Sequence, residues 1–219
     1  MTPRATRLMP VVLEGPAGPL EGLLQEREGE SPRLVAVVCH PHPLYGGTLH
    51  NKVVHRTAAT LHELGAAVLR FNFRGVGASA GAHDRGEGEI GDAGAAIEFL
   101  RRRHPRAHVW IAGFSFGSWI AARLAAGDSK IERMILVAPP VTTSNFEVLR
   151  TCTTPKLILQ GTADTVCPPA ALEPEFARWA EPKQLIHIEG ASHFFDRQLG
   201  DLAKAMSQAL ADPVSEATS

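Results

Sequence analysis

The chain has 219 residues, of which 44% are hydrophobic and 21% are charged, and its formal net charge is −1. This length suits one domain with a full core, and the near-neutral charge gives no sign of a polyanion partner such as nucleic acid. The only basic run, Arg101 to Arg103, ends a predicted helix, where positive charge complements the helix dipole. We therefore expect one domain over residues 1–211 and a flexible tail over residues 212–219.

Targeting signals and disulfides are not indicated by the sequence. The N-terminus lacks an apolar signal-peptide core, and no stretch approaches the roughly 20 apolar residues that span a bilayer. Three cysteines, Cys39, Cys152 and Cys167, are too few and too scattered for a disulfide framework. We expect a soluble cytoplasmic protein.

The first predicted elements are two strands, Leu8–Glu14 and Leu20–Arg27, separated by a turn rich in Gly and Pro. Partial alternation of apolar and polar residues in both strands is typical of an antiparallel sheet edge. The next predicted strand, Arg33–Cys39, is almost continuously apolar, as in strands buried on both faces. Similar strands are predicted at Ala66–Phe71, His108–Ala112, Met134–Ala138, Lys156–Gln160 and Gln184–Ile188.

Helical patterns separate these strands. They cover Leu49–Leu64, Ile90–Arg103, Ser115–Ala126, Pro169–Ala180 and Phe194–Leu210. Strands that alternate with helices predict parallel pairing through right-handed crossovers. The expected fold class is therefore α/β, with a mostly parallel eight-stranded sheet and helices on both faces. The short connector between Pro139 and Thr154 leaves no room for a lid domain.

A candidate nucleophile lies in the motif Gly113-Phe-Ser115-Phe-Gly117, between a buried strand and an apolar helix. A sharp turn at this point strains the backbone of the serine and exposes its hydroxyl, and glycine fits where the chain passes close to its neighbours. The five-residue pattern alone is a moderate signal, but its strand–turn–helix context favours catalysis. The alternative is a tight turn whose serine only caps the helix.

A serine nucleophile needs a base, and groups that follow parallel strands meet at one edge of the sheet. Asp164 follows the strand Lys156–Gln160, and His193 follows the strand Gln184–Ile188. The order Ser, Asp, His fits this architecture, with Asp164 orienting the ring of His193. Alternatives with less support are Asp196 and Glu189 as the acid and His187 as the base, since these fall in a helical turn, at a strand end and inside a strand.

Acyl transfer also needs two donors for the oxyanion. One donor should be the backbone N–H of Phe116, directly after the nucleophile. The second should come from the loop after the Arg33–Cys39 strand, where Pro41 and Pro43 have no N–H. This leaves His42 as the natural donor, with Leu44 or Tyr45 in reserve. His40 and His42 lack further ligands at zinc spacing, so we expect no metal and no cofactor.

The runs Cys39–Val54 and Arg70–Ser79, which read CHPHPLYGGTLHNKVV and RFNFRGVGAS, identify a family resemblance. Together with the serine motif, they resemble small lidless bacterial members of the α/β-hydrolase superfamily, related to dienelactone hydrolases and short-chain carboxylesterases. The resemblance extends over nearly the whole chain. It implies the triad Ser115, Asp164 and His193, and oxyanion donors at His42 and Phe116. Dienelactone hydrolases carry a cysteine nucleophile, so Ser115 weighs against that substrate.

The resemblance and the motifs together predict a serine hydrolase that cleaves small soluble carboxylic esters or thioesters. Alternatives are a non-catalytic binding protein, or an acyl transferase, peptidase or perhydrolase with the same triad. The expected partner is a small acyl ester, without nucleic acid or membrane, and the sequence is compatible with a homodimer. Arg74 is interpreted as a structural salt bridge rather than a substrate contact. The residues predicted to bind substrate are Tyr45 and Phe194. Further candidates for the pocket walls are Phe114, Trp119, Phe146 and Phe195, with Phe114 and Trp119 favoured as core.

Overall fold

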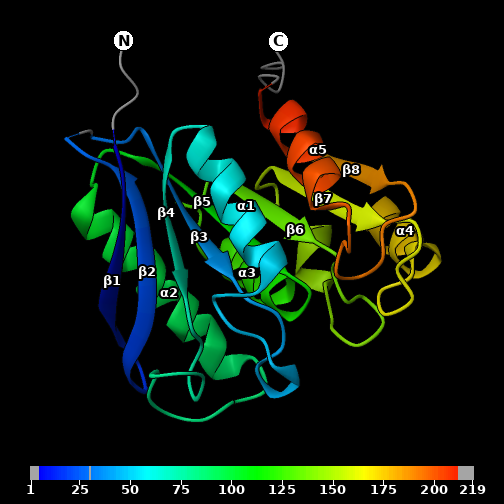
Figure 1. The fold of residues 1–219 in the computed structure, drawn as a ribbon. Helices are drawn as coiled ribbons and strands as arrows, with labels where there is room; N and C mark the ends of the chain where they lie inside the picture. The colour runs from blue at the N-terminus through cyan, green and yellow to red at the C-terminus, as the bar shows by residue number, and fades with distance from the viewer. Residues whose placement is uncertain (1–4, 30, 212–219) are drawn as a thin grey trace.

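The computed structural model describes residues 5–29 and 31–211, and the predicted tail at 212–219 lies outside them. Within the described residues, eight strands form one sheet in the order β1-β2-β4-β3-β5-β6-β7-β8 (Figure 1). The strands are β1 Thr6–Gly15, β2 Gly18–Arg27, β3 Leu34–Cys39, β4 Ala66–Phe71, β5 His108–Phe114, β6 Arg133–Val137, β7 Lys156–Gly161 and β8 Lys183–Ile188. This confirms the predicted eight-stranded sheet.

Antiparallel pairing is confined to one side of the sheet. The hairpin of β1 and β2 closes where Gly15 faces Gly18, and β2 pairs antiparallel with β4. All pairs from β4 through β3, β5, β6 and β7 to β8 are parallel. The carboxyl ends of β3, β5, β7 and β8 therefore share one edge, and the loops that leave them are brought together there.

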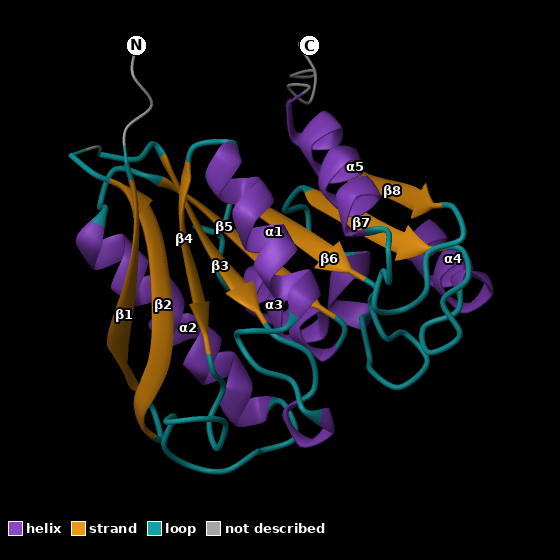
Figure 2. Ribbon diagram, viewed as in Figure 1, coloured by secondary structure: helices purple, strands orange, loops and turns teal. Residues whose placement is uncertain are grey.

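Helices cover both faces of the sheet, as Figure 2 shows. The helices are α1 Lys52–Glu63, α2 Glu87–Arg103, α3 Phe116–Gly127, α4 Pro169–Arg178 and α5 Leu199–Ala211, and short 3₁₀ turns lie at Pro43–Tyr45 and Glu147–Arg150. Helices α1 and α5 share a core with the sheet residues Val38 and Val68. Helices α2, α3 and α4 cover the opposite face, around Val37 and Leu69. Side chains of the central strands enter the two cores alternately, because successive residues point to opposite faces.

Three predicted helix starts are wrong by three residues or more, and one of them is α2, which begins at Glu87 rather than Ile90. Helix α1 begins at Lys52 rather than Leu49, because the Asn51 side chain accepts the N–H groups of Val53 at 2.9 Å and Val54 at 3.4 Å. The last helix begins at Leu199 rather than Phe194, since Phe195 (φ 51°) and Arg197 (φ 66°) adopt left-handed backbone conformations that a helix cannot continue. That break lets the chain present His193 at the sheet edge before α5 turns away.

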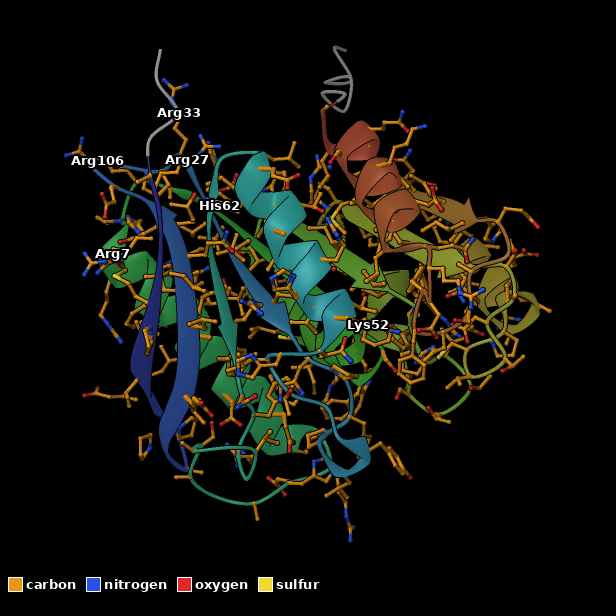
Figure 3. The ribbon with its side chains drawn as sticks, viewed as in Figure 1. Arg7, Arg27, Arg33, Lys52, His62 and Arg106 are labelled. Carbon is orange, nitrogen blue, oxygen red and sulfur yellow. The ribbon has the colours of Figure 1, made fainter. Side chains whose placement is uncertain are left out.

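Charged side chains are unevenly placed around the sheet. Figure 3 shows Arg7, Arg27, Arg33 and Arg106 at the end of the molecule opposite the carboxyl ends of the parallel strands, whereas Lys52 stands at the start of α1. The Arg74 guanidinium binds the buried carboxylate of Asp92 through two nitrogens, at 3.0 and 2.8 Å, which confirms its structural role.

No helix of the described residues is long and apolar enough to cross a membrane.

Candidate active site

The three predicted triad residues, from three separate loops, form one hydrogen-bonded chain. Ser115 lies between β5 and α3, Asp164 follows β7, and His193 follows β8. The Oγ atom of Ser115 lies 3.2 Å from Nε2 of His193, and Nδ1 of His193 lies 2.8 Å from Oδ2 of Asp164. This is the geometry in which an imidazole can take a proton from the hydroxyl while a carboxylate holds its tautomer.

Asp164 is almost fully buried, with 3% of its surface exposed, yet each carboxylate oxygen is satisfied. Oδ1 accepts the N–H groups of Val166 at 2.9 Å and Cys167 at 2.8 Å, and Oδ2 also accepts Nε2 of Gln160 at 3.1 Å. Burial alone would raise the pKa of Asp164, but the hydrogen bonds from His193 and Cys167 hold the pKa below its ordinary value. The carboxylate is therefore charged and acts as a fixed acceptor for the ring.

Cys167 stands close enough to Asp164 and His193 that the three could be taken for a metal-ligand group. Burial, with the nearby Asp164 carboxylate, raises the pKa of the Cys167 thiol to about 12. A thiol that stays protonated is a poor nucleophile. Nδ1 of His193 is directed to Asp164, so the His193 ring and the Asp164 carboxylate bind each other.

The turn that carries Ser115 explains the glycines on either side. Ser115 has φ 51° and ψ −120°, a strained backbone conformation at the point where β5 ends and α3 begins. A Cβ atom on Gly113 would lie 2.1 Å from the carbonyl oxygen of Gly117, and one on Gly117 would lie 2.3 Å from the carbonyl oxygen of Cys39. The motif is therefore required by close backbone contacts. The serine side chain makes no capping hydrogen bond, which rejects the capping interpretation.

The loop after β3 approaches the start of α3. Its Leu44 and Tyr45 N–H groups are already used, because they donate to Nδ1 and the carbonyl oxygen of His42. No acceptor for the His42 N–H is found among the described residues. The N–H of Phe116 opens α3 and has no intrahelical acceptor. The rings of His42 and Phe116 lie 4.8 Å apart, so the two residues predicted to supply the oxyanion donors are neighbours.

His40 links this loop to the backbone that follows β4. It is completely buried, its Nδ1 donates to the carbonyl oxygen of Pro41 at 2.6 Å, and its Nε2 accepts the N–H of Phe73 at 3.0 Å. Burial lowers the pKa of His40 to about 4, so the ring is neutral. Both ring nitrogens are bonded to the backbone, which leaves His40 no role as a metal ligand.

Comparisons with known proteins show the family of the chain. A family model described as "Serine aminopeptidase, S33" matches residues 30–150, which is more than half of the chain and includes Ser115. The chain belongs to this family. The match makes it a hydrolase of the α/β-hydrolase superfamily, and the matched segment ends before Asp164 and His193.

Relatives of this S33-family hydrolase share its whole fold. An α/β serine hydrolase homologue from Coxiella burnetii is 38% identical, has a TM-score of 0.88, and the match covers 92% of this chain and 97% of that one. A lidless α/β serine hydrolase from Xanthomonas campestris is 37% identical, with a TM-score of 0.87 and 94% of each chain covered. An uncharacterized protein of Rickettsia prowazekii is 38% identical over 210 residues, which is 91% of this chain and 87% of the relative.

The predicted substrate-binding residues of this S33-family hydrolase separate into two groups. Tyr45 and Phe194 are 86% and 46% exposed, and the Phe194 ring lies 5.1 Å from that of His193. Phe114 is buried beneath His193, and Phe195 is buried in the core shared with α5. Trp119 packs on Phe116 at the site's border, and Phe146 stacks on Trp179 in the core. Of these six residues, Tyr45 and Phe194 are the exposed ones.

The weaker alternatives for acid and base lie outside the triad. Asp196 is exposed and pairs with Lys52, and the His187 ring is directed towards Glu173 at 3.6 Å.

Sequence reasoning missed a second imidazole–carboxylate pair. His83 donates from Nδ1 to the buried carboxylate of Glu89 at 2.7 Å, and its ring lies 4.9 Å from that of His42. The sequence signal for this pair was the Gly-rich stretch before α2, in which His83 comes six residues before Glu89.

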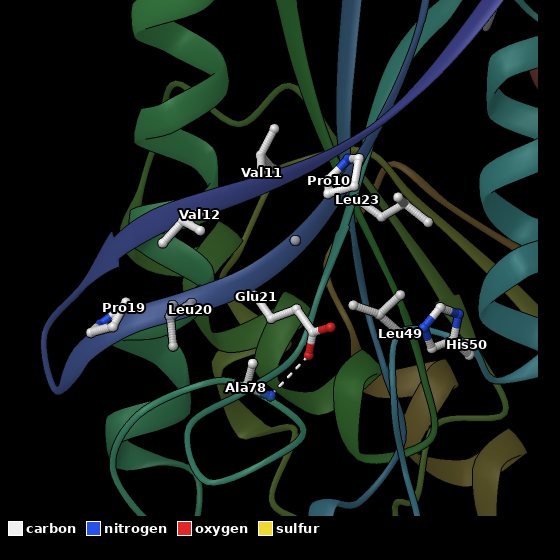
Figure 4. Close-up of a pocket in the computed structure, with 11 residues that line it drawn as sticks. Pro10, Val11, Val12, Pro19, Leu20, Glu21, Leu23, Leu49, His50 and Ala78 are labelled. Atoms are coloured by element: carbon white, nitrogen blue, oxygen red, sulfur yellow. Dashed lines mark hydrogen bonds between the residues drawn. The ribbon is translucent and has the colours of Figure 1, made fainter.

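An open apolar pocket of about 670 Å³ lies elsewhere, over the β1–β2 hairpin (Figure 4). Pro10, Val12 and Leu23 form walls, and the Glu21 carboxylate accepts the N–H of Ala78 at its border. No triad residue lines this pocket. The candidate active site of the S33-family hydrolase is therefore the surface around Ser115.

Proposed function

We propose that this hydrolase cleaves small carboxylic esters or thioesters through an acyl-enzyme formed on Ser115. The observation that carries the proposal is the hydrogen-bonded chain Ser115–His193–Asp164, with distances of 3.2 and 2.8 Å, at the open edge of the sheet. Esterases among the structural neighbours, such as Est1E of Butyrivibrio proteoclasticus at 16% identity and a TM-score of 0.80, share the fold alone.

In the first half-reaction, Oγ of Ser115 attacks the acyl carbon while Nε2 of His193 takes its proton. The carbonyl π electrons move to oxygen, and the backbone N–H groups of His42 and Phe116 stabilise that oxyanion. Collapse of the tetrahedral intermediate breaks the bond to the alcohol or thiol, which takes the proton from His193. Water then repeats the sequence, releases the acid and restores Ser115.

The test compares the hydrolysis of p-nitrophenyl acetate and butyrate by wild type and by Ser115→Ala. We expect Ser115→Ala to lose at least about 10⁴-fold in kcat, and a fluorophosphonate probe to label wild type only. Ser31→Ala, at an exposed serine before β3, is the matched control and should behave as wild type. Equal turnover by wild type and Ser115→Ala would remove Ser115 as the nucleophile.

Peptide-bond cleavage is a second candidate because of the description of the matched family. An aminopeptidase needs a free carboxylate for the substrate's α-ammonium group. Two acids near the site already have partners, since Asp196 binds Lys52 and Glu89 binds His83. Ester cleavage is therefore favoured, and an alanyl-p-nitroanilide in the same assay separates the two activities.

A further inference from the structure

A group of three rings lies against the proposed oxyanion hole. The centroids of His42 and Phe116 are 4.8 Å apart, those of His42 and His83 are 4.9 Å apart, and those of His83 and Phe116 are 5.8 Å apart. His42 lies in the loop after β3 and Phe116 opens α3, and each carries one of the proposed oxyanion donors. His83 is the third side chain that touches both.

The ring of His83 is held by a rigid support. Glu89 is fully buried in the first turn of α2, and its carboxylate also accepts the N–H groups of Asp84 at 2.9 Å and Gly86 at 2.8 Å. Burial alone would raise the pKa of Glu89, but these backbone donors and His83 keep the pKa below its usual value. The acceptor is therefore an ionised carboxylate, and hydrogen bonds to such groups are short and strong.

The next turn of α2 is fixed as well. Asp92, also fully buried, binds the Arg74 guanidinium and the Arg74 backbone N–H. Gly86 packs so closely on Trp119 that a Cβ atom there would lie 2.2 Å from the indole ring. The loop that carries His83 is thus tied to α2 by hydrogen bonds and packs closely on α3.

We propose that His83, held by the buried carboxylate of Glu89, is a positioning residue that fixes the distance between the two oxyanion donors at His42 and Phe116. This inference rests on the proposed function. A developing oxyanion is stabilised only when both donors are aimed at it before the reaction begins. His83 acts through its ring contacts on both donor residues.

The test replaces His83 by Ala and by Gln. Gln keeps a donor for Glu89 but removes the ring, so it separates the support of α2 from the positioning of the donors. We expect both variants to lower kcat for p-nitrophenyl butyrate about 10- to 100-fold, below the full loss of one donor, with KM within about twofold. The Ki of a trifluoromethyl ketone, whose adduct places an oxyanion in the hole, should rise by the same factor as kcat/KM falls.

A matched pair provides the control. His108 also bonds a glutamate, Glu132, at 2.6 Å, but at the opposite edge of the sheet and exposed to solvent. His108→Ala and His108→Gln should keep wild-type kcat and Ki. A structural role for His83 would instead lower the melting temperature and leave the kcat of the folded His83→Gln enzyme unchanged.

The outcomes separate this inference from the proposed function. Unchanged kcat and Ki in folded His83→Gln, with Ser115→Ala inactive, would overturn the positioning role and leave the esterase proposal intact. A wild type that neither hydrolyses esters nor reacts with the fluorophosphonate would overturn both. A parallel loss of kcat and inhibitor affinity at nearly constant KM supports the positioning role.

Discussion

At the scale of single residues, the most constrained group is the Asp164 carboxylate. It accepts four hydrogen bonds, from His193, Gln160, Val166 and Cys167. An amide at this position would bring an NH₂ group against one of these donors. The side chain therefore has to be a carboxylate for His193 to keep its proton on Nδ1.

We expect Asp164→Asn to lower kcat by about 10⁴-fold, because the amide favours the wrong tautomer of His193. Steady-state kinetics with p-nitrophenyl butyrate measure this effect. Asp196→Asn is the control, since the exposed Asp196 pairs with Lys52 rather than with the triad. A smaller loss in Asp164→Asn than in Asp196→Asn would contradict the assignment of the acid.

His40 should make the free energy of unfolding depend on pH. Burial lowers its pKa from 6.5 to about 4 in the folded protein. Above pH 6.5 the ring is neutral in both states and its full contribution is present. As the pH falls towards 4, the unfolded chain binds a proton that folded His40 does not, so stability decreases. The expected loss is on the order of 3 kcal/mol.

Urea unfolding at several pH values between 7 and 4 tests this expectation for wild type and His40→Gln. The fall in unfolding free energy should be smaller in His40→Gln, because glutamine does not titrate. Subtracting the two curves removes the shared contribution of the carboxylates. Exposed His50→Gln should follow wild type, and a His40→Gln curve parallel to wild type would show that His40 does not titrate as described.

At the scale of elements, the turn between β5 and α3 is limited by backbone contacts. Gly117→Ala would place Cβ 2.3 and 2.5 Å from the carbonyl oxygens of Cys39 and His40. We expect this variant to lose about 1–3 kcal/mol of stability and most of its activity, since the oxyanion loop must move. Chemical unfolding and kcat measure the two effects.

Gly127→Ala provides the control at the other end of the same helix. A Cβ atom there meets nothing within 4 Å. Alanine should therefore keep activity and be neutral or stabilise α3 by up to about 1 kcal/mol. Similar stability losses in both variants would show that glycine is not required by close contact at position 117.

The elements that the sequence predicts well are those with a strong local signal. Continuous apolar runs such as Leu34–Cys39 identified the buried strands, and loops after β7 and β8 identified Asp164 and His193. The start of α5 was missed, because Phe194 and Phe195 continue the apolar pattern while the backbone at Phe195 turns left-handed. His83 was missed because its partners His42 and Phe116 are neighbours only in space.

At the scale of the whole molecule, the candidate site is open. The connection between β6 and β7 contains only the short turn Glu147–Arg150, and no separate domain covers Ser115 within the described residues. A lipase that opens a lid at an oil–water interface shows a sudden rise in rate when its substrate exceeds the solubility limit.

We expect no such rise for this protein. Its rate with tributyrin should saturate below the solubility limit and should not jump above it, because no domain among residues 5–29 and 31–211 covers Ser115. Titration of tributyrin hydrolysis through that limit, with a lidded lipase as the reference, measures the difference. A sharp increase at the limit would require a covering element after all.

The exposed position of Phe194 and Tyr45 around an uncovered serine has a consequence for how water is kept from the reacting bond. Electrostatic stabilisation of an oxyanion weakens when bulk water reaches it. No separate domain of the described residues covers Ser115, so in the proposed reaction the bound ester itself would have to shield the intermediate. A compact ester would leave the oxyanion in contact with water, whereas an ester with a broad apolar group would cover it.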